Sequence, residues 1–169
     1  MNARARFDPY ALFEALERRR VSYVVVGGFA RVVQGSAEVT SGLDIVPSLR
    51  EDNIRRLSQA LDELRTKRGR TVTPDALAGE ERVSVATAAG TLTVVPVPWG
   101  TRGYDDIRIR ANRENLGRGI RPQIASTVDL VRMLEASSRP KDLERLQRVR
   151  RMMELERVRT RRPSLRIER

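Results

Sequence analysis

A buried strand that ends in two glycines constrains the fold of this chain more than any other feature of its sequence. The apolar run Val21–Val26 predicts the strand, and Gly27-Gly28 stops it, because glycines interrupt regular structure. A short helix is expected over Phe29–Gln34 and a second strand over Leu43–Val46. Two short strands joined through a glycine turn and a helix are typical of an α/β protein, and such a turn exposes backbone N–H groups.

Helical and strand periodicities continue along the chain. Asp8, followed by proline, predicts a helix start, and Asp52–Arg65 has the apolar stripe of an amphipathic helix. A polar loop is expected over Arg68–Gly79, and then a hairpin of Arg82–Thr87 and Thr91–Val95.

Two helices are predicted in the last third of the chain. One begins at Ser126 with the spacing of a capping box and runs through Leu134, and the other begins near Arg139-Pro140. Four apolar side chains of the last helix are expected on one face: Leu143, Leu146, Val149 and Met153.

The order of elements predicts an α/β fold, a mixed sheet with helices on one face and a small C-terminal helical cap. We assign residues 1–118 to the core, 119–158 to a helical part packed on it, and 159–169 to a basic, disordered tail.

Positive charge is the strongest compositional feature. The chain has 33 Lys and Arg against 22 Asp and Glu, a formal net charge of +11, which favours polyanions such as DNA or RNA. A bias of the composition toward Arg explains the same excess without a ligand. The candidate nucleic-acid contacts, which would otherwise form a solvated helix face and chain end, are Arg148, Arg150, Arg151, Arg157, Arg159, Arg161 and Arg162.

The sequence contains neither Cys nor His. Disulfides, thiolate chemistry and zinc–thiolate sites are therefore excluded, and so are hydrolases that depend on a histidine base. The apolar runs are too short to cross a bilayer, which takes about 20 residues, and no secretory signal is expected. These features fit a cytoplasmic protein without membrane contact.

The glycine turn and the second strand carry the chemistry. Together they resemble the signature of the nucleotidyltransferase superfamily that includes DNA polymerase β, in the style of small bacterial members from abortive-infection and toxin–antitoxin systems. The matching residues are Val26-Gly27-Gly28, Gly35-Ser36, Thr40, Leu43-Asp44-Ile45, the segment 100–106 and the segment 139–142. The resemblance implies a minimal nucleotidyltransferase fold.

The chain departs from the family's pattern at the carboxylates. Asp-x-Asp on a strand presents two carboxylates to a divalent metal, but here Gly42 takes the first position and only Asp44 remains. Thr93 occupies the position that matches the family's third carboxylate, and its side chain is a hydroxyl. The nearest other acids are Asp105 and Asp106. Asp44 alone would hold metal weakly, so no cofactor is required, although Mg²⁺ is possible with a bound nucleotide.

Five residues are candidates for phosphate binding, each with a plainer alternative. They are Gly27, Gly28, Ser36, Arg139 and Lys141. The glycines otherwise form a tight turn, Ser36 a turn residue, and the two basic side chains an ordinary first helical turn with surface charge.

Four further positions remain open in the sequence. Arg31 either reaches a phosphate at the glycine turn or faces solvent. Trp99 is expected in the core rather than as a base-stacking side chain, and Met152 and Met153 are expected in the core rather than at a protein interface.

The lost carboxylates and the positive charge favour a catalytically degenerate nucleotidyltransferase fold, a pseudoenzyme kept as a nucleic-acid-binding or regulatory module. An active, toxin-like enzyme that transfers a nucleotide from NTP to RNA, such as tRNA, or to protein is the first alternative. A protein-interaction component of a toxin–antitoxin-like system is the second.

Overall fold

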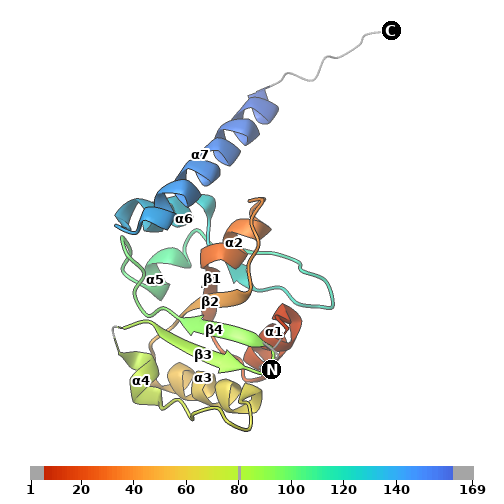
Figure 1. Ribbon diagram of the computed structural model, residues 1–169, viewed down its shortest axis with the longest axis vertical. Coiled ribbons are helices and arrows are strands. Elements are labelled where there is room, and N and C mark those ends of the chain that lie inside the picture. Colours follow the sequence, from red (N-terminus) through yellow and green to blue (C-terminus); the bar gives the residue numbers. More distant parts are fainter. Residues whose placement is uncertain (1–5, 80, 162–169) are drawn as a thin grey trace.

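A computed structural model describes residues 6–79 and 81–161 of the chain. One sheet runs through the molecule in the order β3-β4-β2-β1-β6-β5 (Figure 1). The strands are β1 (Tyr23–Val26), β2 (Gly42–Pro47), β3 (Val83–Thr87), β4 (Gly90–Val94), β5 (Asn112–Arg113) and β6 (Gln123–Ile124). The helices are α1 (Pro9–Arg18), α2 (Gly27–Val33), α3 (Glu51–Leu64), α4 (Pro74–Ala78), α5 (Tyr104–Ile107), α6 (Thr127–Ala136) and α7 (Pro140–Arg161).

The sheet is mixed, as predicted. β2 runs antiparallel to β1 and parallel to β4, and β6 joins the other side of β1 in parallel. The β2–β4 register opposes Asp44 to Thr93 and Gly42 to Thr91. Because side chains two apart on a strand share a face, Gly42 and Asp44 lie on the same side of the sheet.

Aromatic side chains join the first helix to the sheet. Phe13 of α1 is fully buried and stacks on Tyr23 of β1, with ring centroids 6.4 Å apart. Phe29 of α2 meets Phe13 edge to face at 5.5 Å. Both arrangements suit aromatic quadrupoles and bury large apolar areas.

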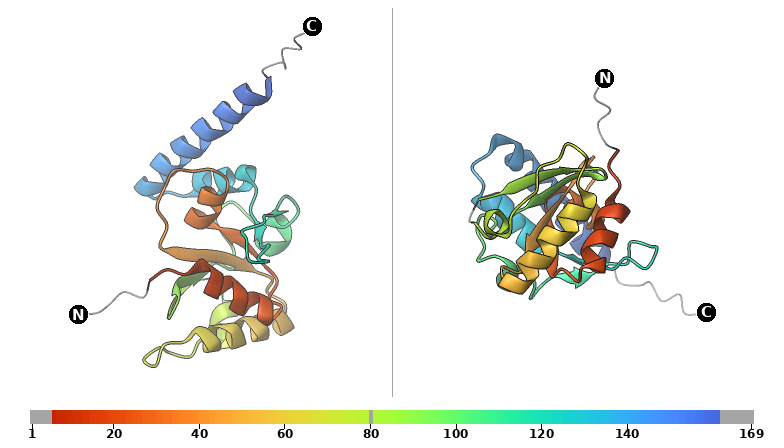
Figure 2. Two further views of the ribbon diagram at one scale, coloured as in Figure 1. Left: turned by 90° about the vertical axis from the view of Figure 1, so that its right-hand side faces the viewer. Right: turned by 90° about the horizontal axis from the view of Figure 1, so that it is seen from below.

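The helices form two groups about the sheet. In Figures 1 and 2, α1, α3 and α4 lie below it, and α2, α6 and α7 lie above. The expected placement of helices on one face describes the lower group, and the upper group encloses the site described below.

The predicted polar loop over residues 68–79 contains a short helix, α4. Thr73 caps it by accepting a hydrogen bond from the Ala76 N–H, and Pro74 occupies its first turn. Leu77 is fully buried beside α3 and anchors the segment to the core. Val72 and Leu77, the two large apolar residues of this polar stretch, gave too weak a pattern to predict this helix.

The face predicted for α7 is wrong at Leu143, which is 61% exposed, whereas Leu146 and Val149 are buried. The apolar residues of α7 recur at every third position, but a helical turn takes 3.6 residues. The apolar stripe therefore drifts by about 60° at each step and leaves α6 at both ends.

The distal part of α7 extends away from the rest of the molecule (Figure 1). It continues to Arg161, into the range predicted as tail, and Arg162 lies outside the described residues. Among the residues that the structure covers, no helix is both long and apolar enough to span a membrane.

Candidate functional site

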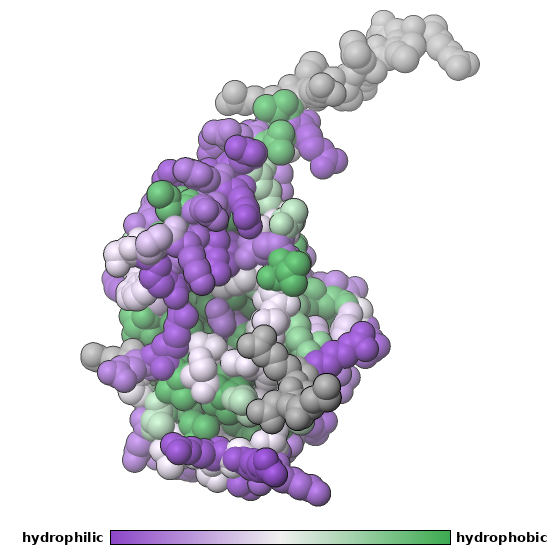
Figure 3. Space-filling view, in the orientation of Figure 1, coloured by the Kyte–Doolittle hydropathy of each residue, from purple (hydrophilic) through white to green (hydrophobic). Residues whose placement is uncertain are grey.

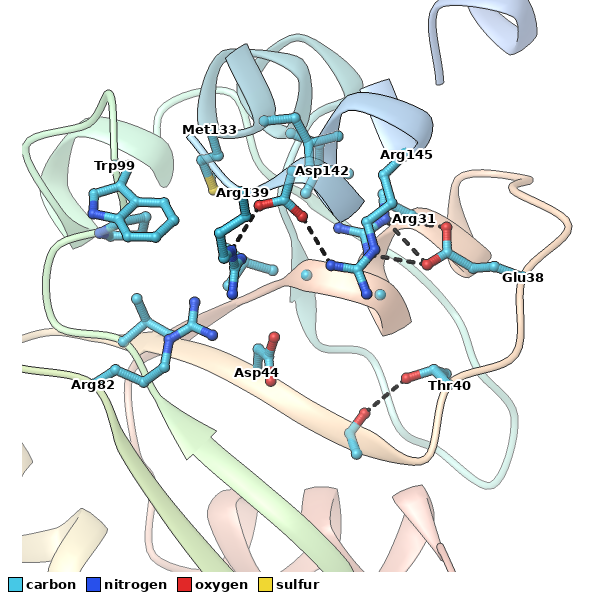
Figure 4. Close-up of a pocket in the computed structure, with 18 of the residues that line it drawn as sticks. Arg31, Glu38, Thr40, Asp44, Arg82, Trp99, Met133, Arg139, Asp142 and Arg145 are labelled. Carbon is cyan, nitrogen blue, oxygen red and sulfur yellow. Dashed lines mark hydrogen bonds and ion pairs between the residues drawn. The ribbon is translucent and has the colours of Figure 1, made fainter. Parts of the chain in front are cut away.

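A cavity of about 590 Å³ opens between the sheet and the upper group of helices. Its floor is β2 with the first turn of α2, and its walls come from the 38–41 loop, the 95–99 loop, α6 and the start of α7. Figure 4 shows Asp44 below a row of arginine side chains that reach inward from three different parts of the chain.

The floor is built around Asp44. Gly27 has a φ of +69°, and a Cβ atom at that position would collide with Oδ2 of Asp44. Glycine is therefore required twice, for its backbone conformation and for the closeness of the carboxylate. A Cβ atom at Gly42 would lie 3.0 Å from the Thr91 carbonyl oxygen. Gly42 keeps unbroken register with β4, so it is a regular strand position and not a bulge.

Burial raises the pKa of Asp44 above its ordinary value, because the cavity floor disfavours the charged carboxylate. The positive charges of Arg82, Arg31 and Arg139 and a hydrogen bond from Thr93 oppose this effect without cancelling it. Asp44 is thus a carboxylate that the pocket does not fully compensate.

A buried ion pair closes the loop after α2. Arg31 is 6% exposed, and its Nη2 lies 2.9 Å from Oε1 of Glu38. Ser36 donates a second hydrogen bond to Glu38 at 2.8 Å. Burial alone would raise the pKa of Glu38, but the hydrogen bonds from Arg31 and Ser36 lower it. Of the two alternatives for Arg31, the one in which it faces solvent is wrong.

A second ion-pair cluster forms the wall at the start of α7. Asp142 is 1% exposed and accepts hydrogen bonds from Arg139 at 2.9 Å, from Arg145 at 2.8 Å and from the Ser137 hydroxyl. Burial works to raise the pKa of Asp142, but these three donors outweigh it and lower the pKa. The guanidinium of Arg139 also lies over Trp99, 5.0 Å from the ring centroid.

Three of the five predicted phosphate-binding residues line the cavity, namely Gly27, Gly28 and Arg139. Ser36 is instead engaged with Glu38, and Lys141 is exposed on α7 outside the cavity lining. Trp99 was expected in the core, but it lines the cavity and is 52% exposed, so that prediction is wrong.

Three further acids lie near the site, and none of them stands at the strand positions of Gly42 and Thr93. Glu81 lines the cavity beside Arg82 and is exposed just before β3. Asp106 is bound by Arg132 at 2.9 Å and by the Arg102 N–H, and Asp105 pairs with Arg108. Neither side chain lines the cavity.

Sequence reasoning missed Arg82, Arg145, Glu38 and Asp142. Arg82 lies just before β3, and the hairpin register that carries it to the cavity is not visible in the local pattern. The Arg139, Asp142 and Arg145 series has helical i, i+3 spacing, which was a usable signal.

Two solved structures share this architecture. A candidate nucleotidyltransferase from Thermotoga maritima matches 96% of this chain over 100% of its own, with a TM-score of 0.51 and 14% identity. The second is the antibiotic-resistance factor ANT(2'')-Ia, whose solution structure reports substrate-regulated conformation dynamics. The match covers 90% of each chain, with a TM-score of 0.52 and 13% identity.

The chain has the nucleotidyltransferase fold. At these identities the likeness establishes the fold, which confirms the fold predicted from residues 26–45. No protein-family model and no curated protein matches the sequence.

The nucleotidyltransferase fold implies a divalent metal, so the donor set at the predicted carboxylate positions matters. Asp44 is one carboxylate with a raised pKa, and its neighbours Gly42 and Thr93 supply none. Glu38 and Asp142 are held by arginines. Within residues 6–79 and 81–161, no group of three or more acidic side chains could hold an ion. These residues do not fit the two-metal site of nucleotidyl transfer.

Proposed function

We propose that this chain is a catalytically degenerate nucleotidyltransferase-fold protein that binds nucleic acid, in the cytoplasm and without a required metal. One observation carries the proposal: the cavity floor keeps Asp44 as its sole strand carboxylate, while arginines point into the space above it. Mg²⁺ ordinarily neutralises phosphate charge where carboxylates hold it. Guanidinium groups neutralise phosphates directly and bind them in bidentate fashion.

The arginines of the cavity supply the first part of the proposed surface. Arg82 is exposed at the cavity edge, and Arg145 and Arg139 are 37% and 46% exposed while bound to Asp142. Each guanidinium has five donors and uses only some of them on a carboxylate. A phosphate can therefore be bound without breaking these ion pairs.

The distal part of α7 supplies the second part. Arg148, Arg151, Arg157 and Arg159 are exposed there, and hydrophilic side chains dominate the surface over this helix (Figure 3). Arg150 is exposed too but pairs with Glu135 of α6. An extended basic helix beside a basic cavity suits a polyanion longer than one nucleotide.

Fluorescence anisotropy of labelled RNA and DNA over a salt series tests the proposal. Affinity should fall steeply with salt, and replacing Arg148, Arg151, Arg157 and Arg159 by Ala should weaken binding and lower the salt slope by about one per lost contact. Four α1 and α3 arginines, Arg18, Arg19, Arg55 and Arg56, provide the matched control, because they are remote from the cavity lining. Salt-insensitive or absent binding would contradict the proposal.

An active enzyme is the second candidate, favoured by the position of Asp44 at the cavity floor beside the glycine turn. Incubation with each radiolabelled nucleoside triphosphate, Mg²⁺ or Mn²⁺, and RNA or protein acceptors tests it. Metal-dependent labelling that disappears in Asp44→Ala would show that the chain is an active nucleotidyltransferase and that its site is not degenerate. Unlabelled acceptors, together with RNA or DNA binding that survives Asp44→Ala, are expected.

A protein-interaction component of a toxin–antitoxin-like system is the third candidate. Leu155 and Val158 of α7 are 61% and 58% exposed, an apolar area that nucleic-acid binding does not use. A specific protein that co-purifies with the chain and is released by substituting these two side chains would favour it.

A further inference from the structure

Trp99 is held on a rigid part of the cavity wall. The Thr101 N–H and hydroxyl both donate to the Pro98 carbonyl, at 3.1 and 2.9 Å, which closes a turn around Trp99. A Cβ atom at Gly100 would lie 3.0 Å from the Arg132 carbonyl oxygen of α6, so the turn is seated directly on that helix. The backbone at Trp99 is therefore held in place, although about half of the surface of this residue is exposed.

Arg139 orients the indole from the α7 side. Its Nε donates to Asp142 at 2.9 Å, and its guanidinium lies 5.0 Å from the Trp99 ring centroid. A cation over an indole is a favourable contact and limits rotation of the ring. The chain thus keeps an exposed, pre-oriented aromatic surface at the mouth of an arginine-lined cavity, next to Val97, which is 45% exposed.

We infer that Trp99 stacks on an unpaired nucleobase of the bound nucleic acid, while the adjoining phosphate lies among the cavity arginines. The inference rests on the proposed function and adds the class of ligand, a single-stranded segment or strand end. In a duplex both faces of each base are covered by its neighbours, so a base must leave the stack to reach such a side chain. Figure 4 shows Trp99 and Arg82 on the same side of the cavity, facing the space above Asp44.

The cavity volume agrees with this class of ligand. About 590 Å³ lies in the range of pockets that enclose one small organic molecule, which suits a single nucleotide unit. Every base has a flat π-face, so one stacking surface recognises an unpaired base without selecting its identity. We expect a preference for single strands without strong sequence specificity.

The test uses the intrinsic fluorescence of the protein, because Trp99 is its sole tryptophan. A short single strand of mixed sequence, the blunt duplex of that sequence, and an abasic strand of equal length are titrated in turn. The single strand should quench the tryptophan emission, whereas the abasic strand, which offers phosphates without bases, should bind without quenching. The duplex should bind more weakly than the single strand.

Anisotropy of the labelled single strand supplies the second measurement. Trp99→Ala should weaken binding at least about fivefold, the loss expected for one stacked base, and Trp99→Phe should retain most of the affinity. Ile109→Ala changes an exposed apolar residue outside both α7 and the cavity lining; it is the matched control and should change nothing.

The two proposals fail in different ways. Salt-dependent binding of all three ligands, without quenching and with full affinity in Trp99→Ala, would overturn the stacking inference and leave nucleic-acid binding in place. Binding of no nucleic acid by the folded wild-type chain would overturn both.

Discussion

The floor and the wall of the cavity each hold one aspartate, half-buried Asp44 and fully buried Asp142, and the pKa values of the two shift in opposite directions. Asp142 in the wall accepts hydrogen bonds from Arg139, Arg145 and Ser137, and its pKa is lowered. Asp44 in the floor has arginines near it but no arginine hydrogen bond among the described residues, and its pKa is raised.

Partners, rather than burial, account for the difference. Burial acts on both carboxylates in the same direction, and only donors that satisfy the charged form reverse it. In the wall, donors of this same chain already satisfy the charged form of Asp142. In the floor, the raised pKa of Asp44 is what an acid shows when the compensating cations are too far away to bond.

Breaking the wall should have the largest effect. Asp142→Asn removes the charge that three donors share, and we expect the free energy of unfolding to fall by about 2 kcal/mol. Thermal or urea unfolding measures the change. Glu144→Gln, an exposed acid on the same helix, is the control and should have little effect. Equal unfolding free energies of Asp142→Asn and wild type would show that the negative charge of Asp142 does not stabilise the fold.

Lowering the pH should remove the difference in unfolding free energy between wild type and Asp142→Asn. The folded-state pKa of Asp142 lies below its unfolded value of about 3.9, so its stabilisation is complete well above that pH and is lost as pH falls through the folded pKa. Unfolding of wild type and Asp142→Asn from pH 7 to pH 2 should therefore converge at the acidic end. A gap that persists at pH 2 would have to come from packing.

Crowding the floor should have the next largest effect. Gly27→Ala places a Cβ atom against Asp44 at a positive φ, and we expect a loss of about 1 kcal/mol. The double variant with Asp44→Ala should recover the part due to the collision and keep the part due to the backbone. Additive losses in this double-mutant cycle would mean that the two residues are not in contact.

Neutralising the floor should have the smallest effect and the opposite sign from neutralising the wall. The pKa of Asp44 is raised in the folded state, so its charged form costs stability as pH rises from the unfolded pKa through the folded one. Asp44→Asn should therefore raise the unfolding free energy at pH 7, by under about 1 kcal/mol. A marked loss would show that the arginines compensate Asp44 better than its surroundings suggest.

Much of the fold followed from short-range patterns. Asp8 and Ser126 accept the capping hydrogen bonds predicted for them, from the Ala11 and Asp129 N–H groups. The register that sets Thr93 opposite Asp44 came only with the structure. Caps and strand alternation depend on neighbours within a few residues, so they are readable without a structure.

The cavity itself was much less predictable. Arg82, Glu38 and Asp142 meet there from separate parts of the chain, and only Asp142, through its i, i+3 spacing with two arginines of α7, had a local signal. Trp99 looked like a core residue because large aromatics usually are buried. Its exposure depends on how the 95–103 segment is seated on α6.

By itself the sequence determined the α/β class, the glycine turn before Asp44, and Gly and Thr at positions 42 and 93, because these follow from residue identity and periodicity. Only the tertiary structure decided which arginines surround Asp44, which aspartate is compensated, and where the indole points. Those outcomes depend on distances between elements remote in sequence, and an ionised or aromatic side chain changes its role with a few ångströms of displacement.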